Sequence, residues 1–444
     1  MNERKKIGVI SLGCDKNRID TEKMLGILSD GYEIVSDIDK ANIVIINTCA
    51  FIKSSKEESI EEILSASELK KSGSVEKIIV TGCLPQKYSE EIFNELPEVD
   101  AFLGVSDYKK LPEVIDSIYG GKRVKAVGNP CLETERLIKR VKTTSNFAYL
   151  KIADGCSNHC TYCSIPSIRG KYRSVPLENL ISEAKELGNL NELILVAQDV
   201  TAYGQDLVPA RSITDLIRAL SALQNVKGIR LLYCYPERIT DELIRELASN
   251  AKLIRYIDIP LQHADDRILK LMNRKGTAES YLSLIERLKR SVPGIAIRST
   301  FITGFPTEDE EAVDNLVAFL KRAKLFNVGF FKYSREEGTP AYNMSGQIPA
   351  GEKTKRYKKL YSVQKAIVKE NLKALCGRIF KVAAEGFDEN LLVYYGRAYF
   401  NAPDVDGKIY FFSKEEVKIG EYYNVKIHKA SGYDLYGEIY EPSK

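Results

Sequence analysis

Three cysteines lie close together near the middle of the chain. Cys156, Cys160 and Cys163 are separated by three and then by two residues. Cysteine thiolates at such short spacings hold iron–sulfur clusters, and a cubane cluster usually takes four of them. Because no fourth cysteine follows nearby, one iron would keep an open coordination position. A ligand that offers an amine and a carboxylate, as the methionine part of S-adenosylmethionine does, could bind there and accept an electron for radical chemistry.

The competing interpretation of these cysteines is a zinc site or a chance group of buried thiols. A zinc knuckle takes four ligands in paired spacing, and His159 is the one further candidate in the segment. The spacing after a strand-like segment therefore favours an iron–sulfur cluster. It also resembles the signature of the radical S-adenosylmethionine superfamily, and this resemblance implies a partial (βα) barrel. Tyr162, inside the signature, is then a candidate cofactor contact.

A second set of cysteines is spread over the first 83 residues. Cys14, Cys49 and Cys83 each stand just beyond the carboxyl end of a strand-like segment. In an open α/β sheet those ends share one edge, where ligands bind, and Gly13 and Gly82 would let the backbone turn sharply there. A single cysteine is often a simple core residue. Three in the same structural position favour a second metal site, again with one iron open, here for an exogenous sulfur species.

Cys131, Cys234 and Cys376 lack such a context, and we expect them in the core. The chain runs from Met1 straight into a strand-like segment without a signal-peptide core, so we expect a cytoplasmic protein whose cysteines are not disulfides. No apolar run approaches the roughly 18 residues of a membrane span, so no membrane partner is expected. The net charge of only +4 says nothing about nucleic acid.

The elements that must position these cysteines follow an α/β pattern. Strand-like runs at 7–12, 43–46 and 78–81 alternate with segments of helical periodicity such as 55–69. Buried parallel strands have this continuous apolar character. The pattern predicts an N-terminal doubly wound α/β domain over residues 1–130.

The alternation resumes after a charged connector at 131–144. The predicted strands lie at 147–152, 192–197, 229–233, 256–259, 296–302 and 327–331. Six strands with helices between them suit an open (βα) barrel, which with a long helix at 352–375 would span residues 145–372. The last stretch, 373–444, is rich in Val, Ile, Tyr and Phe with turn signals, and predicts a small β-barrel.

Polar residues at the carboxyl ends of the predicted barrel strands are further candidates, because functional residues concentrate there. They are expected to contact the cofactor or substrate, and each has an ordinary structural alternative. Asp199 could be a helix N-cap, His263 a buried structural histidine, and Arg298 a salt-bridged residue. Four of the candidates, Gln198, Asp199, Gln262 and His263, follow predicted strands. The other two, Arg298 and Ser299, lie within the strand at 296–302 and could line the same mouth.

A basic loop follows the barrel cysteines. It carries Arg169, Lys171 and Arg173. A solvated run of charge is the commoner meaning of such a pattern, although its position favours contact with a carboxylate or phosphate.

Several motifs together resemble one family over nearly the whole chain, the methylthiotransferases, and within it the RimO branch. They are SLGCDKN at 11–17, IPSIRGKYRS at 165–174, AQD at 197–199, PLQH at 260–263 and GRAYFNAPDVDG at 396–407. Two positions depart from the branch. Asp15 stands where proline is common, and Thr307 replaces a common glycine.

The resemblance implies an N-terminal cluster domain, a radical barrel and a C-terminal TRAM barrel. It implies that Cys14, Cys49 and Cys83 hold an auxiliary 4Fe–4S cluster and that the three barrel cysteines hold a second. The implied reaction replaces a β C–H of an aspartate in ribosomal protein S-twelve with a methylthio group. S-adenosylmethionine would serve as methyl donor and as radical source, with flavodoxin or ferredoxin as electron donor to a monomeric enzyme.

The charge of the last domain bears on the substrate. Residues 371–444 carry ten Lys and Arg against eleven Asp and Glu. A barrel that binds RNA should show a basic face, whereas this balance better matches a basic ribosomal protein. Two alternatives stay open. One is a transfer-RNA adenosine methylthiotransferase, and the other is a non-catalytic RNA-binding protein with structural zinc.

Overall fold

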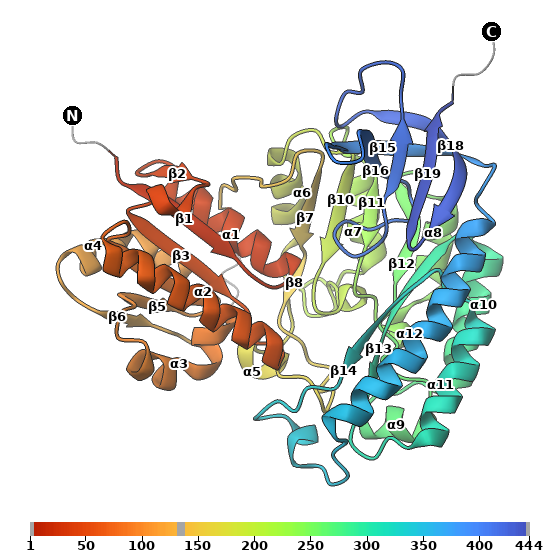
Figure 1. The fold of residues 1–444 in the computed structure, drawn as a ribbon, viewed down its shortest axis with the longest axis horizontal. Coiled ribbons are helices and arrows are strands. Elements are labelled where there is room, and N and C mark those ends of the chain that lie inside the picture. Colours follow the sequence, from red (N-terminus) through yellow and green to blue (C-terminus); the bar gives the residue numbers. More distant parts are fainter. Residues whose placement is uncertain (1–3, 131–137, 441–444) are drawn as a thin grey trace.

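The computed structural model describes residues 4–130 and 138–440. Three parts follow one another along the chain (Figure 1): a six-stranded sheet, a second six-stranded sheet and a closed barrel. Residues 131–137 of the charged connector, which include Cys131, lie outside the described residues. Among the described helices, none combines the length with the apolar character that crossing a bilayer takes.

The N-terminal sheet is parallel throughout, with strand order β2-β1-β3-β4-β5-β6. Ile43 and Ile45 of β3 pack on one face and Val44 and Ile46 on the other, which explains the continuous apolar run. Helices α1 and α4 cover the first face, and α2 and α3 cover the second, so the predicted doubly wound domain is confirmed. The elements are β1 (Lys6–Ser11), α1 (Asp15–Leu28), β2 (Glu33–Val35), β3 (Ile43–Thr48), α2 (Lys53–Ser72), β4 (Lys77–Gly82), α3 (Cys83–Glu95), β5 (Ala101–Leu103), α4 (Leu111–Tyr119) and β6 (Val124–Ala126).

The strand order of this sheet reverses between β1 and β3. The connection from β1 leads to β2 on one side, whereas the chain from β3 continues to β4 on the other. Crevices that bind ligands open at such a switch point, beyond the carboxyl ends of the strands. The topology therefore places the loops after β1 and β3 beside a ready-made binding site.

The second sheet is also parallel, with order β14-β13-β12-β11-β10-β7, and stays open between β14 and β7. Helices pack on its outer face and share one apolar core with it, as the predicted partial barrel requires. The strands are β7 (Phe147–Lys151), β10 (Glu192–Val196), β11 (Ile229–Leu231), β12 (Leu253–Asp258), β13 (Ala296–Thr303) and β14 (Asn327–Lys332). The outer helices are α6 (Leu177–Glu186), α7 (Ile213–Ser221), α8 (Asp241–Ser249), α10 (Ala278–Ser291) and α11 (Glu310–Ala323). Shorter elements at its rim are β8 (Ala153–Asp154), α5 (Ile165–Arg169), β9 (Arg173–Ser174) and α9 (Asp266–Leu271).

A long helix, α12 (Ala350–Lys373), leads to the third part. There five strands close into a barrel in the order β15-β16-β17-β19-β18, which confirms the predicted small β-barrel. These strands are β15 (Ile379–Asp388), β16 (Val393–Arg397), β17 (Ile409–Phe412), β18 (Tyr422–Ser431) and β19 (Asp434–Ile439). The domain limits given above stay predictions.

Buried ion pairs join the closed barrel to the open one. Arg397 of β16 is 6% exposed and lies 3.0 Å from Glu192 of β10 and 2.7 Å from Glu385. Arg230 of β11 pairs with the same Glu192 carboxylate. Burial raises the pKa of Glu192, but Arg230 and Arg397 outweigh burial and hold the pKa below its usual value. The carboxylate is therefore charged and depends on both arginines.

Replacing Arg397 by methionine is expected to lower the free energy of unfolding by about 3 kcal/mol, because it leaves a buried carboxylate partly unpaired. Thermal unfolding of the purified protein measures this as a clear drop in the melting temperature. Lys418→Met removes an exposed charge of the same barrel and should change little. Equal melting temperatures for the two variants would contradict the prediction.

Candidate functional site

The first cysteine set lies at the switch point of the N-terminal sheet. Cys14 caps the N-terminus of α1, Cys49 directly follows β3, and Cys83 begins α3 after β4. Gly13 adopts φ +86°, and a Cβ there would lie 3.0 Å from the Cys49 sulfur. Only glycine permits this conformation together with so close an approach. The loop after β1 is therefore pressed against the loop after β3.

Asn17 ties these loops together. Its Nδ2 donates hydrogen bonds to the carbonyls of Leu12 and Thr48, both at 3.0 Å. Its Oδ1 lies 3.9 Å from the Cys83 sulfur. One side chain thus contacts the Cys83 thiol and the backbone beside the other two cysteines.

Two residues of this set are largely shielded from water, and the third, Cys14, is partly exposed. Cys49 is 7% exposed and Cys83 is 5% exposed. Burial raises the pKa of the Cys83 thiol to about 12, Arg169 opposes this, and the neighbouring Cys49 and Cys14 thiols raise the pKa further. The Cys14 and Cys49 thiols thus lie close enough to Cys83 to act on its pKa. Metal binding would have to displace protons from them.

The second cysteine set lies in the loop between β8 and α5. Burial raises the pKa of Cys156 to about 11 and that of Cys163 to about 12, and Cys160 contributes in both cases. Within the loop, the Cys163 backbone N–H donates to the Cys160 carbonyl at 3.1 Å. His159 has φ +52°, which turns the backbone between the first two cysteines. The three cysteines therefore lie within one compact loop.

Two groups of contacts anchor this loop to the barrel. The backbone N–H of Thr161 donates to the Met272 carbonyl, and its hydroxyl donates to the Leu271 carbonyl at 2.7 Å. On the other side, the Asp199 carboxylate accepts from Asn158 at 2.9 Å and from Arg238 at 2.6 Å. The loop is held from both sides, as a site that must keep its geometry requires.

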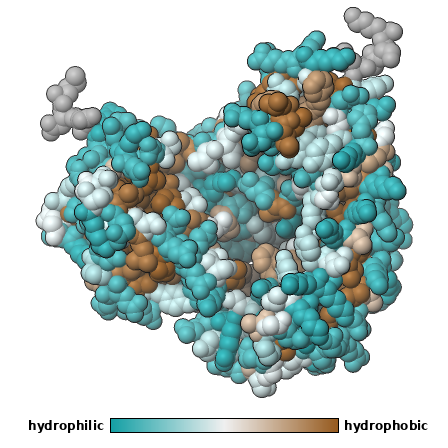
Figure 2. All heavy atoms as spheres, in the orientation of Figure 1, coloured by the Kyte–Doolittle hydropathy of each residue, from teal (hydrophilic) through white to brown (hydrophobic). Residues whose placement is uncertain are grey.

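The two cysteine sets meet at the interface between the N-terminal sheet and the open barrel. Arg169 of α5 lies 3.9 Å from the Cys83 sulfur and also binds Asp154, two residues before Cys156. Asp15, next to Cys14, accepts a hydrogen bond at 2.9 Å from Tyr233, which follows β11. Figure 2 shows the molecule hollowed between these two parts. The fold thus brings together residues that lie more than 70 positions apart in the sequence.

The residues of both cysteine sets fit iron–sulfur clusters. In the part of the chain that the structure describes, no three His, Cys, Asp or Glu side chains come close enough to bind one ion. In a cubane each thiolate binds a different iron, so the sulfurs stand further apart than the ligands of one zinc. Each cysteine set offers thiolates, the donor type that iron–sulfur clusters take.

Among the predicted cofactor contacts, Gln198 has an unused buried atom. Its Nε2 donates to Asp154 at 3.1 Å, whereas its Oε1 is buried without a hydrogen-bond partner among the residues that the structure describes. Asp199 is 1% exposed and is occupied by the loop contacts described above and by Thr201 at 2.6 Å. Gln198 is therefore the candidate with capacity left for a ligand.

His263 and Gln262 lie where the sequence placed them, just past β12. His263 is fully buried; its Nδ1 accepts from the Asp265 N–H at 3.0 Å, and its Nε2 lies 3.2 Å from Glu308. With both ring nitrogens occupied, the structural alternative is favoured. Gln262 has φ +73°, and its backbone N–H and carbonyl bond to β13.

The β13 candidates are also engaged within the protein. Arg298 lies 2.9 Å from Asp258 and 3.6 Å from Asp406 of the closed barrel, which agrees with the salt-bridge alternative. The Ser299 hydroxyl donates to the Ile259 carbonyl at 2.7 Å. Tyr162 packs partly buried against the cluster of Phe305 and Tyr333.

Several residues of this interface were missed as site residues by sequence reasoning. The motif at 11–17 contains Asn17, and Asp154 precedes the cysteine signature by two residues, so both carried a detectable signal. Arg274 carried none, yet its guanidinium lies 4.0 Å from the Cys160 sulfur and stacks on Tyr235 at 4.0 Å. Of the remaining cysteines, Cys234 is fully buried as expected, whereas Cys376 is only partly buried.

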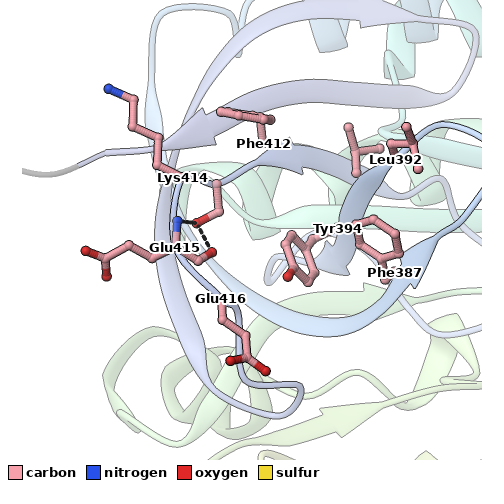
Figure 3. A pocket seen from close by; sticks show the side chains of 9 residues that line it. Phe387, Leu392, Tyr394, Phe412, Lys414, Glu415 and Glu416 are labelled. Atoms are coloured by element: carbon pink, nitrogen blue, oxygen red, sulfur yellow. Dashed lines mark hydrogen bonds between the residues drawn. The ribbon is translucent and has the colours of Figure 1, made fainter.

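A pocket of about 280 Å³ opens on the closed barrel (Figure 3). Phe387 and Tyr394 lie on one side of it with ring centroids 4.9 Å apart, and Glu415 and Glu416 lie on the facing loop. Leu392, also in its lining, is 70% exposed. Lys414 also lines the pocket, so its exposed apolar side chains adjoin two carboxylates and one ammonium group.

Comparison with known proteins identifies all three parts. Residues 6–104 match the Uncharacterized protein family UPF0004, residues 150–320 match the Radical SAM superfamily, and residues 376–439 match the TRAM domain. Among solved structures, the radical S-adenosylmethionine methyltransferase TsrM from Kitasatospora setae superposes with a TM-score of 0.57 at 15% identity. It covers 86% of this chain and 81% of its own. This likeness shows the shared fold.

Full-length relatives are much more similar. The ribosomal protein uS12 methylthiotransferase RimO of Acetivibrio thermocellus is 46% identical, and that of Clostridium kluyveri 47%, each over 99% of both chains. The corresponding protein of Trichlorobacter lovleyi is 43% identical, with the same coverage. Identity of this level over the whole length includes both cysteine sets and the closed barrel within the aligned region. The chain therefore belongs to the methylthiotransferase family, in its RimO branch.

Proposed function

We propose that this protein replaces a β C–H of an aspartate in ribosomal protein S-twelve (uS12) with a methylthio group. An unactivated C–H has no acidic proton that a side-chain base could remove. When bound at the barrel cysteines, a reduced 4Fe–4S cluster and S-adenosylmethionine supply the radical for this step. The N-terminal cysteines would hold the auxiliary 4Fe–4S cluster, which carries the sulfur.

One observation carries this proposal above all. Arg169 touches Cys83 of one set and binds Asp154 beside the other, so a single side chain links the two sets across the interface. A general radical enzyme needs only the barrel set. Two sets on one shared interface suit a reaction in which the group to be transferred waits beside the site where the substrate radical forms.

The residues around the barrel loop would position the cofactor. Gln198 offers its unused Oε1 to an amine or hydroxyl, and its Nε2 stays on Asp154. Asp199 and Arg238 would act on the cofactor only through Asn158, because they hold the loop that carries Cys156. The barrel mouth would be lined or supported by the remaining candidates, Gln262, His263, Arg298, Ser299 and Tyr162.

The proposal also covers the electron donor, the oligomeric state and the cellular compartment. The bound cluster needs an external reductant, and a flavodoxin or ferredoxin is the class that fits. A monomer in the cytoplasm would meet ribosomal protein and reductant alike. Whether uS12 is modified free or in the assembled subunit is part of the same test.

The experiment that tests the substrate compares three acceptors under reducing, anaerobic conditions. They are purified uS12, the assembled small subunit and bulk transfer RNA, and mass spectrometry follows the gain of a methylthio group. We expect the product on aspartate of the ribosomal protein. Product on transfer-RNA adenosine alone would overturn the protein-substrate proposal.

The pocket of the closed barrel provides a second test, because its two glutamates, against one lysine, suit a basic ribosomal protein. Reversing charge in Glu415→Lys/Glu416→Lys should raise the KM for uS12 roughly ten-fold at low salt with little change in kcat. Glu438→Lys, an exposed acid elsewhere on this barrel, is the matched control. A KM equal to that of the control would exclude this pocket as a docking surface.

A further inference from the structure

Arg169 is buried in a group of charges between the two cysteine sets. It is 2% exposed, its Nη2 donates to Asn17 at 2.7 Å, and its Nη1 donates to Asp154 at 2.9 Å. Both nitrogens also approach the Asp20 carboxylate, at 3.2 and 3.3 Å. The guanidinium fork is therefore filled by partners from both parts of the molecule.

The charges around Arg169 balance. Lys151 is buried beside it and pairs with both Asp20 and Asp154, so two cations face two carboxylates. Burial raises the pKa of Asp154, but Arg169 and Lys151 outweigh burial and hold the pKa below its usual range. Arg169 also contacts a cysteine: its Nη2 lies 3.9 Å from the Cys83 sulfur.

The packing of α5 keeps Arg169 in this place. Ile168, the residue before it, is fully buried in the apolar core formed by α2, α3 and the N-terminal sheet. In sequence, α5 directly follows the loop of the barrel cysteines. Its Ile168 side chain nevertheless packs in the core of the N-terminal domain. Arg169 consequently has little freedom to move away from Cys83.

We propose that Arg169 is a positioning residue for the auxiliary site, which holds Cys83 against the barrel and sets the reduction potential of a cluster bound there. A positive charge and a hydrogen-bond donor at a cluster sulfur stabilise the reduced, more negative state. Without Arg169 the auxiliary cluster should therefore be harder to reduce. This inference rests on the proposed assignment of Cys14, Cys49 and Cys83 to that cluster.

The test measures the auxiliary cluster alone, in full-length protein that carries Cys156→Ala, Cys160→Ala and Cys163→Ala. Redox titration followed by electron paramagnetic resonance compares Arg169→Gln with the parent. We expect a more negative midpoint potential and an altered spectrum at unchanged iron content. Lys171→Gln, which removes an exposed charge from the same loop, should leave both unchanged.

A second variant keeps the test decisive if Arg169→Gln destabilises the protein. Arg169→Gln/Asp20→Asn restores the balance of buried charge, because Lys151 and Asp154 remain as one pair. We expect this double variant to fold and to keep the more negative potential, since the contact with Cys83 is still lost. A return to the parent potential would assign the effect to net charge and overturn the proposal.

The outcomes separate this inference from the proposed function. If the parent triple variant binds no iron, the auxiliary site itself is wrong. If it binds about four irons and Arg169→Gln leaves the potential unchanged, only the role of Arg169 is refuted. Arg274→Gln, at 4.0 Å from Cys160, should leave the auxiliary potential unchanged, which controls for loss of any buried arginine.

Discussion

Replacing Cys14, Cys49 and Cys83 together by alanine should abolish methylthiolation but retain reductive cleavage of S-adenosylmethionine. The barrel site keeps its own three thiols, its loop contacts and Gln198, so cofactor binding there does not depend on the N-terminal set. Iron analysis should show a loss of about four irons per chain, as for one cubane. Deoxyadenosine and methylthio product, measured in the same reaction, separate the two activities.

The control for this variant is Cys376→Ala, which removes a partly buried thiol that belongs to neither set. It should keep the full iron content and both activities. Methylthio product from the triple variant would show that the sulfur does not pass through the N-terminal site. Loss of deoxyadenosine as well would show that the two sites are not independent.

The reciprocal replacement of Cys156, Cys160 and Cys163 by alanine should abolish both deoxyadenosine and methylthio product. About four irons should remain, because the N-terminal thiols are positioned by their own sheet, by Asn17 and by Arg169. Iron and sulfide quantitation beside the visible absorbance measures the remaining cluster. The remaining iron distinguishes this variant from a misfolded protein.

Cys234→Ala serves as the control for the barrel variant, since Cys234 is fully buried nearby but stands outside both sets. It should retain both products. Complete loss of iron from the barrel variant would contradict a separate N-terminal cubane. Zinc in place of iron in anaerobically purified protein would contradict both cluster assignments.

The sequence predicted the layers of the fold well because buried parallel strands leave a local signal. Residues 43–46 pack on both faces of the sheet and so form a continuous apolar run. The three-residue strands β2, β5 and β6 were not predicted, because they are too short for a recognisable pattern. A short strand is defined by its neighbour in the sheet, which local pattern does not describe.

The cofactor candidates show the same limit. His263 stands past a strand end as predicted, and Arg298 and Ser299 lie within β13, but their partners Glu308, Asp406 and Ile259 come from distant segments. Position along a strand predicts that a side chain reaches the barrel mouth. It does not predict that the side chain is already hydrogen-bonded or paired with another group of the protein.

The sequence by itself determined the two cysteine sets, since short spacing and strand-end position are local properties. Only the tertiary structure decided that these sets share one interface. Residues 17, 83, 154 and 169 meet because α5 packs into the N-terminal core and carries Arg169 with it. Such contacts arise from the docking of two domains, and no local pattern of residues encodes them.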